Sequence, residues 1–100
     1  MSEEQFPGLT AAQIERLALL SEELGEAQHM IGKVLRHGYD SINPVNPGPT
    51  NREALGMELG HVRAAIAMLT GAGDLSATDI SRHGARKLVT VQPWLHHQDA

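Results

Sequence analysis

The stretch that decides the fold runs from Thr10 to His37 and reads TAAQIERLALLSEELGEAQHMIGKVLRH. Thr10, followed three residues later by Gln13, forms a capping-box pattern, which is typical of a helix start. Apolar residues then recur at alternating steps of three and four, at Leu17, Leu20, Leu24, Ala27, Ile31 and Val34. That spacing lines one face of an α-helix. The stretch therefore predicts one long helix over about residues 11–37, ended by Gly38.

A break and a second helix follow. Residues 38–50 are rich in proline and glycine, so they predict a loop. Thr50 and Glu53 repeat the capping-box pattern, and apolar residues again step by four and three until Gly71. The sequence therefore predicts a second helix over about residues 51–70.

A third, shorter helix is predicted after Ser76, whose spacing to Asp79 marks another start, and Pro93 interrupts its weaker apolar pattern. No segment shows the apolar alternation of a strand. We therefore expect an all-α fold, with residues 1–100 forming a single domain. The expected architecture is an antiparallel helical bundle of two long helices plus a shorter third, completed to a four-helix type by oligomerisation.

Composition narrows the function classes. A chain of 100 residues buries about two-thirds of its extended surface, so we expect its stability to be shared with a partner subunit in a homodimer or homotetramer. The net charge of -4 disfavours duplex nucleic acid and membranes as partners. The absence of cysteine excludes disulfides and thiol nucleophiles. The acidic start Met1–Glu4 leads into no apolar run, which predicts a cytoplasmic protein without a signal peptide.

Each long helix has a second row of residues at helical spacing, here called its second stripe, and this row contains the candidate metal ligands. On the first helix it consists of Leu19, Glu23, Glu26 and Met30, and on the second of Ala54, Glu58, His61, Ala65 and Met68. If the stripes face each other, three carboxylates and an imidazole share a half-buried pocket, and a divalent cation would offset their charge. Oxygen donors favour Mg²⁺ or Mn²⁺, whereas a di-iron site would need a second Glu-x-x-His. The alternatives are a solvated acidic helix surface and an ordinary hydrogen-bonded histidine.

These residues resemble a known family. The segment LLSEELGEA, residues 19–27, looks like the Glu-Glu-x-x-Glu helix of the MazG-like all-α nucleoside triphosphate pyrophosphohydrolases. The segment ELGHV, residues 58–62, falls where that family carries Glu-x-x-Asp. The segment KVLRHGY at residues 33–39, the Asn-Pro-rich loop and the closing LHHQ at residues 95–98 are similar to short phage-type members. The resemblance covers about residues 17–98.

The resemblance implies a magnesium-dependent hydrolase that assembles as a dimer or tetramer. It would convert a nucleoside or deoxynucleoside triphosphate to the monophosphate and pyrophosphate, and so control a nucleotide pool. Glu23, Glu26 and Glu58 would be metal ligands, and Glu22 would orient or deprotonate the attacking water. His61 stands where the family has a ligand aspartate. The alternative is therefore a catalytically degenerate module that binds nucleotides or mediates oligomeric interactions.

Several cations are candidates for binding the phosphates: Lys33, Arg36, Arg82, Arg86 and Lys87. The alternative for each is a solvated cation, with Lys33 and Arg36 stabilising a helix C-terminus. Tyr39 and Trp94 are candidates for stacking on the base, but each is equally suited to a core or a subunit contact.

Overall fold

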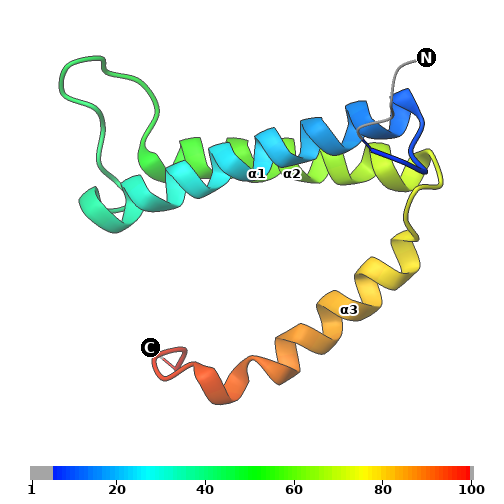
Figure 1. Ribbon diagram of the computed structural model, residues 1–100. Helices are drawn as coiled ribbons and strands as arrows, with labels where there is room; N and C mark the ends of the chain where they lie inside the picture. The colour runs from blue at the N-terminus through cyan, green and yellow to red at the C-terminus, as the bar shows by residue number, and fades with distance from the viewer. Residues whose placement is uncertain (1–5, 100) are drawn as a thin grey trace.

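The computed structural model describes residues 6–99, which form three α-helices and one turn of 3-10 helix (Figure 1). Helix α1 spans Ala11–His37, α2 spans Asn51–Gly71, α3 spans Ala77–Thr90 and η1 spans Gln92–Trp94. No strand occurs in the described part of the chain, so the all-α prediction is confirmed. The predicted acidic start, Met1–Glu4, lies outside the described residues. Within residues 6–99, none of the helices combines the length and apolar content needed to cross a membrane.

Both long helices begin as predicted, at capping boxes. The backbone N–H of Gln13 donates to Thr10 Oγ1 at 3.1 Å, and the Thr10 N–H donates to Gln13 Oε1 at 2.8 Å. Thr50 and Glu53 make the same reciprocal pair, at 3.2 and 3.4 Å. Each box satisfies N–H groups that have no partner inside the helix. Helix α1 ends at Gly38, whose φ of 88° lies in the region that favours glycine.

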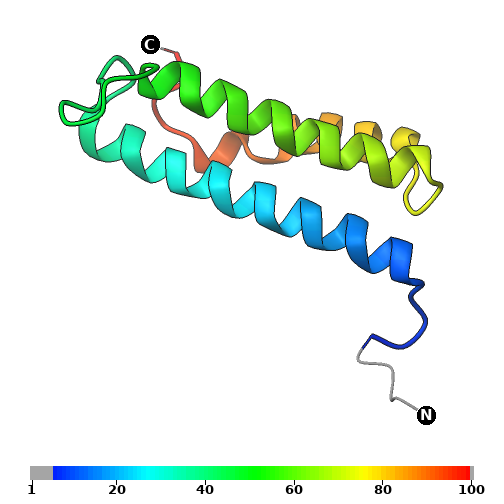
Figure 2. The same cartoon turned by 90° about the horizontal axis from the view of Figure 1, so that it is seen from above.

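Helices α1 and α2 lie side by side and antiparallel along most of their length (Figure 2). The fully buried side chains between them are Ala27 and Met30 of α1 and Ala65 and Leu69 of α2. Two of these four are alanines, whose small side chains let the helices approach closely. The pair forms a hairpin that we call the α1–α2 hairpin.

Much of the long apolar seam of α1 is left uncovered by α2, although its member Ala27 is buried. Leu17, Leu24 and Ile31 stay between 42% and 51% exposed, and Leu59 of α2 is equally open. Helix α2 instead meets the boundary between this seam and the second stripe of α1, where Ala27 lies. The result is an uncovered apolar surface along one side of the hairpin. We call it the apolar hairpin face, made of Leu17, Leu24, Ile31 and Leu59.

Helix α3 stands apart from the hairpin (Figure 1). All of its residues, 77–90, are exposed, and it does not pack along α1 or α2. The chain turns away after α2 through Gly73, with a φ of 81°, and Asp74, which is held by Arg16 of α1 at 2.7 Å. Within one chain, therefore, the expected three-helix bundle reduces to two packed helices and a projecting third. The radius of gyration is 17.6 Å, against about 13 Å for a compact domain of this length.

Candidate metal centre

Four side chains gather on one side of the hairpin. Glu23 and Glu26 come from α1, and Glu58 and His61 come from α2. One ligand atom from each residue lies within 4.8 Å of all the others. We call this group the Glu/His cluster. The structure thus brings together the four residues that the sequence analysis placed around a metal.

The helices position these residues by simple spacing. Each helix contributes a pair at i and i+3, which share one face. Ala27 follows Glu23 by one turn, and Ala65 follows His61 by one turn. Both alanines are buried between the helices, so the two pairs come close from opposite sides.

Two carboxylate oxygens of the cluster are buried without a partner. Glu23 Oε2 and Glu58 Oε2 have essentially no exposed surface and no hydrogen-bond donor among residues 6–99. Their side chains are only 17% and 21% exposed, whereas His61 is 52% exposed. An ionised oxygen that is taken out of water without a partner carries an unrecovered desolvation cost. These two atoms are the observation that points to a cation in the cluster.

The carboxylates also oppose one another's ionisation. The hydrogen bond with Glu58, followed by the negative charges of Glu23 and Glu58, raises the pKa of Glu26 above its ordinary value. Protonated Glu26 therefore stabilises the folded state, and ionised Glu26 destabilises it. The stabilisation is present below the ordinary pKa and is lost as pH rises through the raised pKa. A bound cation would remove this repulsion.

The donor set fits a divalent cation. Three carboxylates supply hard oxygen ligands of the kind that Mg²⁺ and Mn²⁺ prefer, and one imidazole supplies a nitrogen that suits Mn²⁺ better than Mg²⁺. Nδ1 of His61 lies 3.4 Å from Glu58 Oε2 and 3.6 Å from Glu23 Oε2. Neither contact is a hydrogen bond, so the imidazole does not satisfy these two oxygens.

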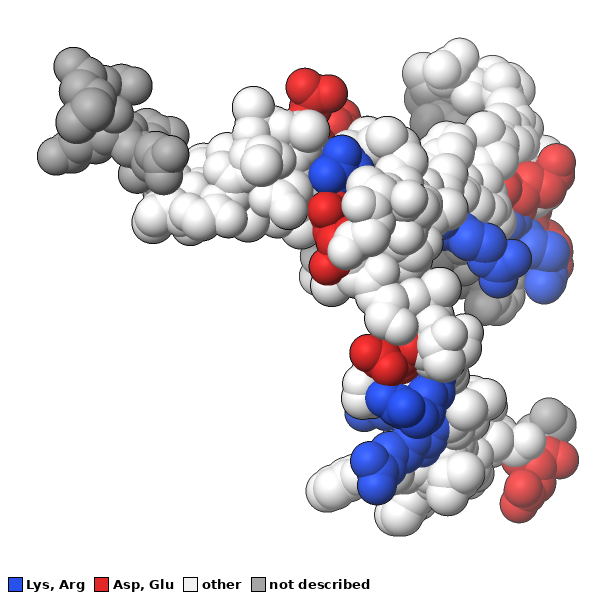
Figure 3. Space-filling model, turned by 90° about the vertical axis from the view of Figure 1, so that its right-hand side faces the viewer, with Lys and Arg blue, Asp and Glu red and all other residues white. Residues whose placement is uncertain are grey.

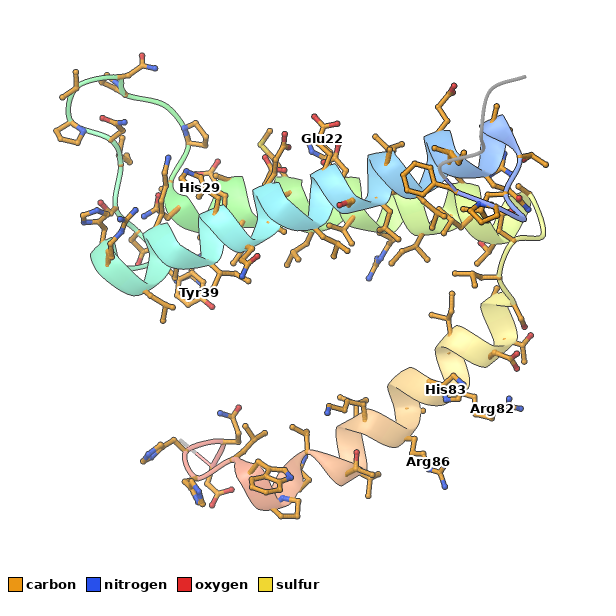
Figure 4. The ribbon with its side chains drawn as sticks, viewed as in Figure 1. Glu22, His29, Tyr39, Arg82, His83 and Arg86 are labelled. Carbon is orange, nitrogen blue, oxygen red and sulfur yellow. The ribbon has the colours of Figure 1, made fainter. Side chains whose placement is uncertain are left out.

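Glu22 lies beside the cluster but outside it. It is exposed and points to the side of the hairpin away from α3 (Figure 4). Its negative charge is one of the causes that raise the pKa of Glu26. Its predicted role, to act on the attacking water, stays a prediction.

A second concave site lies where the loop of residues 38–50 returns to the end of α1. It is a cavity of about 500 Å³, which we call the basic pocket. Its polar lining includes Lys33, Arg36, His37, Ser41, Asn43 and Asn51. The structure therefore brings two of the predicted phosphate-binding residues, Lys33 and Arg36, into one pocket. Lys33 follows Glu26 by seven residues on the same helix face, about 10 Å along α1.

The ends of this loop are held together by Asn51 and Arg52 of α2. Asn51 Nδ2 donates to the Gly38 carbonyl at 3.1 Å. The Arg52 guanidinium stacks on the ring of Tyr39, 4.5 Å from its centre. Tyr39 points to the side of the hairpin opposite Glu22 (Figure 4) and does not line the basic pocket.

The predicted cations of α3 lie far from the cluster within one chain. Basic side chains gather along the projecting arm (Figure 3), where Arg82 pairs with Asp79 at 2.7 Å. Arg82 and Arg86 point away from the hairpin (Figure 4). Lys87 is exposed on the same helix.

Sequence reasoning missed the ion pair between Arg16 and Asp74, which ties the start of α1 to the end of α2. Arg16 Nη2 also donates to Asp74 Oδ1, at 3.1 Å. The hydrogen bond to Arg16, helped by its charge, lowers the pKa of Asp74 below its ordinary value, although partial burial opposes this. The two residues are 58 positions apart, so no spacing pattern could have indicated the contact.

Comparison of the chain with protein-family models, curated proteins and solved structures gives no match.

Proposed function

We propose that this chain is a metal-dependent hydrolase that converts a nucleoside or deoxynucleoside triphosphate to the monophosphate and pyrophosphate. One observation carries the proposal: Glu23, Glu26, Glu58 and His61 converge within 4.8 Å, and two of their oxygens are buried without a partner. The resemblance to the MazG-like family suggests the reaction class. The donor set supports the metal.

Each residue has a role in this proposal. Glu23, Glu26, Glu58 and His61 would hold Mg²⁺ or Mn²⁺. When bound, the metal offsets phosphate charge and lowers the pKa of coordinated water. Glu22, exposed one position before Glu23, is suited to accept a proton from the attacking water. The chain contains no cysteine, so no thiol of this chain can act as the nucleophile in place of water.

The basic pocket is suited to the rest of the nucleotide. Lys33 and Arg36 supply positive charge, and Asn43 supplies amide and carbonyl groups. A volume of about 500 Å³ lies within the usual range for small-ligand sites. Because Lys33 and Glu26 share a face of α1, a triphosphate held at the cluster can extend toward this pocket.

The direct test is a screen of the common ribonucleoside and deoxyribonucleoside triphosphates with Mg²⁺ and, separately, with Mn²⁺. We expect one or a few of them to give the monophosphate and pyrophosphate, identified by chromatography. Excess chelator should stop the reaction. Release of inorganic phosphate alone, or equal turnover with chelator, would contradict the proposal.

A second candidate function is favoured by His61. If protonated, its imidazole would place a positive charge 3.4 to 3.6 Å from Glu58 and Glu23 and neutralise part of the cluster without a metal. The chain would then be a catalytically degenerate module that binds nucleotides or mediates oligomeric interactions. Calorimetric binding of a nucleotide that is insensitive to chelator, with no turnover in either metal, would favour this function.

A further inference from the structure

The basic pocket differs from the Glu/His cluster in the sign of its charge. Its lining includes Lys33 and Arg36, and no aspartate or glutamate of the described chain lines it. Neither cation forms an ion pair among residues 6–99, and Lys33 is half-buried. Arg36 lies in the last turn of α1, where a cation is favourable by itself, but Lys33 lies before that turn. The pocket therefore holds positive charge that nothing described in the chain balances, which favours an anion.

Hydrogen bonds hold the walls of the basic pocket in place. The Asn51 N–H donates to the Ser41 carbonyl at 3.0 Å, which joins the two ends of the loop. Asn43 Oδ1 accepts from the N–H groups of Val45 and Asn46, at 2.9 and 3.1 Å. Asn43 thus turns its Nδ2 group, a donor, to other partners. Because the walls are already fixed, little ordering is needed when a ligand binds.

The lining of the pocket indicates which kind of anion fits. Lys33, Arg36 and Asn43 supply N–H donors, which suit the oxygens of a phosphate group. No Phe, Tyr or Trp among residues 6–99 lines the pocket, so a nucleobase would find none of the large aromatic rings on which bases stack. The apolar part of the lining consists of Ile42, Pro44 and Val45. A cavity of about 500 Å³ has room for a phosphate together with the organic group that carries it.

Charge along α1 changes sign between the cluster and the pocket. Glu26, His29 and Lys33 share one face of the helix, and Lys33 lies about 10 Å beyond Glu26. The loop of residues 38–50 rises on the side of the hairpin to which Glu22 points (Figure 4). A phosphate at the cluster is repelled by three carboxylates unless a cation lies between them. In the pocket the same phosphate is attracted without any metal.

We propose that the basic pocket is a second phosphate site, which binds the phosphate group of a phosphate ester without a metal. Lys33 and Arg36 bind the phosphate oxygens, Asn43 Nδ2 donates to them, and the apolar wall contacts the organic part. Two sources can supply this group: a nucleotide that also has a phosphate at the Glu/His cluster, or a separate phosphorylated molecule. Only the first source rests on the proposed function, because neither metal nor hydrolysis enters the argument for the site.

Binding in the presence of excess chelator tests the site. The probes are adenosine monophosphate and inorganic pyrophosphate, and binding is followed by the backbone amide NMR signals of the isotope-labelled protein. With at least one probe we expect saturable shifts at residues 41–45 and Asn51, without shifts at Glu23 or Glu58, and an affinity that falls as salt rises. No saturable shift with either probe, or shifts centred on the Glu/His cluster, would overturn the proposal. Adenosine, which lacks the phosphate, is the control, and equally tight binding of adenosine would also overturn it.

Removal of single charges tests the assigned side chains. Lys33→Gln should weaken binding of the probe about tenfold, and Arg36→Gln several-fold, because each loses a charge-assisted hydrogen bond to the phosphate. Arg63→Gln is the matched control, since Arg63 is an exposed arginine of α2 that does not line the pocket. Helical circular dichroism checks the fold, and Arg36→Gln decides if Lys33→Gln does not fold. Parent-like binding by the pocket variants, or equal weakening by Arg63→Gln, would overturn the proposal.

Competition distinguishes the two sources of the phosphate. Mg²⁺ and a nucleoside triphosphate analogue that resists hydrolysis are added to protein already saturated with the probe. If one nucleotide occupies both sites, the analogue displaces the probe from the pocket. If the pocket takes a separate molecule, the probe and the analogue bind together. An analogue that binds with neither Mg²⁺ nor Mn²⁺ would contradict the proposed function, while the chelator experiment still decides the phosphate site.

Discussion

The α1–α2 hairpin and α3 differ in what holds them. Contacts between residues far apart in the sequence hold the hairpin: Ala27 and Ala65 are buried where α1 and α2 pack, and Arg16 pairs with Asp74. The bonds of α3 are local, with the Asp79 N–H donating to Ser76 Oγ at 3.1 Å and with Arg82 pairing to Asp79. Local bonds define where a helix starts, but they do not place it in space. The hairpin therefore presents a formed cluster, whereas the residues of α3 are exposed and the helix packs on neither α1 nor α2.

The largest expected effect is a loss of activity when ligands in the α1–α2 hairpin are replaced. Glu23→Gln, Glu26→Gln and Glu58→Gln should each lower kcat by more than about 100-fold, because a hard-oxygen site loses an anionic ligand. The fold should survive, since repulsion between the carboxylates is relieved. Glu15→Gln, an exposed glutamate of α1 outside the cluster, is the control. Ordinary turnover and metal affinity in Glu26→Gln would show that the cluster is not the site.

Truncating an apolar side chain should destabilise the protein more in the α1–α2 hairpin than in α3. Leu69→Ala removes a side chain that is 1% exposed, so it should lower the free energy of unfolding by about 2–5 kcal/mol. Leu88→Ala, compared at a protein concentration low enough to keep the chain monomeric, should change it by less than about 0.5 kcal/mol. Urea unfolding measures both. Equal losses in the monomer would mean that α3 packs within its own chain.

His61→Asp should sharpen the metal assignment within the hairpin. A fourth carboxylate replaces the imidazole nitrogen, so Mg²⁺-supported turnover should rise about tenfold and the preference for Mn²⁺ should fall. Steady-state rates with each metal measure the change. If rate and metal preference stay as in the parent protein, His61 does not contact the metal.

The smallest expected effect compares two ion pairs by pH. Arg16 lowers the pKa of Asp74, so the stability this pair supplies is present above the ordinary pKa and is lost as pH falls through the lowered value. Asp74→Asn should therefore lower Tm at neutral pH and lose its effect in acid. Asp79→Asn, in α3, should shift Tm less, because its partner Arg82 is exposed. Equal shifts would contradict the difference in anchoring.

Local chemistry made parts of the molecule predictable. The capping boxes at Thr10 and Thr50 locate the starts of both long helices, because each box needs only residues three positions apart. The Glu/His cluster could be predicted because residues at i and i+3 share one face of a helix. Two such pairs come close when those faces of two antiparallel helices lie together. In both cases the pattern lies within one or two turns of a helix.

The rest depended on contacts that leave no local pattern. The spacing alone did not decide which face of α1 meets α2, because α1 has two rows of apolar residues; the structure buries Ala27 and Met30 and leaves Leu24 exposed. The direction of α3 follows from Asp74, which is held by a residue near the other end of the hairpin's sequence. The basic pocket follows from the path of a proline-rich loop, which Asn51 fixes at Gly38.

The two buried alanines also affect which size of cation would fit the Glu/His cluster. Ala27 and Ala65 lie one turn beyond Glu23 and His61, and both are buried, so their small side chains leave room for the two helices to lie close together. Mg²⁺ requires oxygens at about 2.0–2.1 Å in a nearly octahedral shell, whereas Ca²⁺ accepts about 2.3–2.6 Å and more ligands. If the cluster binds a metal, discrimination between these ions would therefore depend in part on residues that do not contact the ion. A larger side chain at Ala65 would widen the cluster and move its selectivity toward the larger ion.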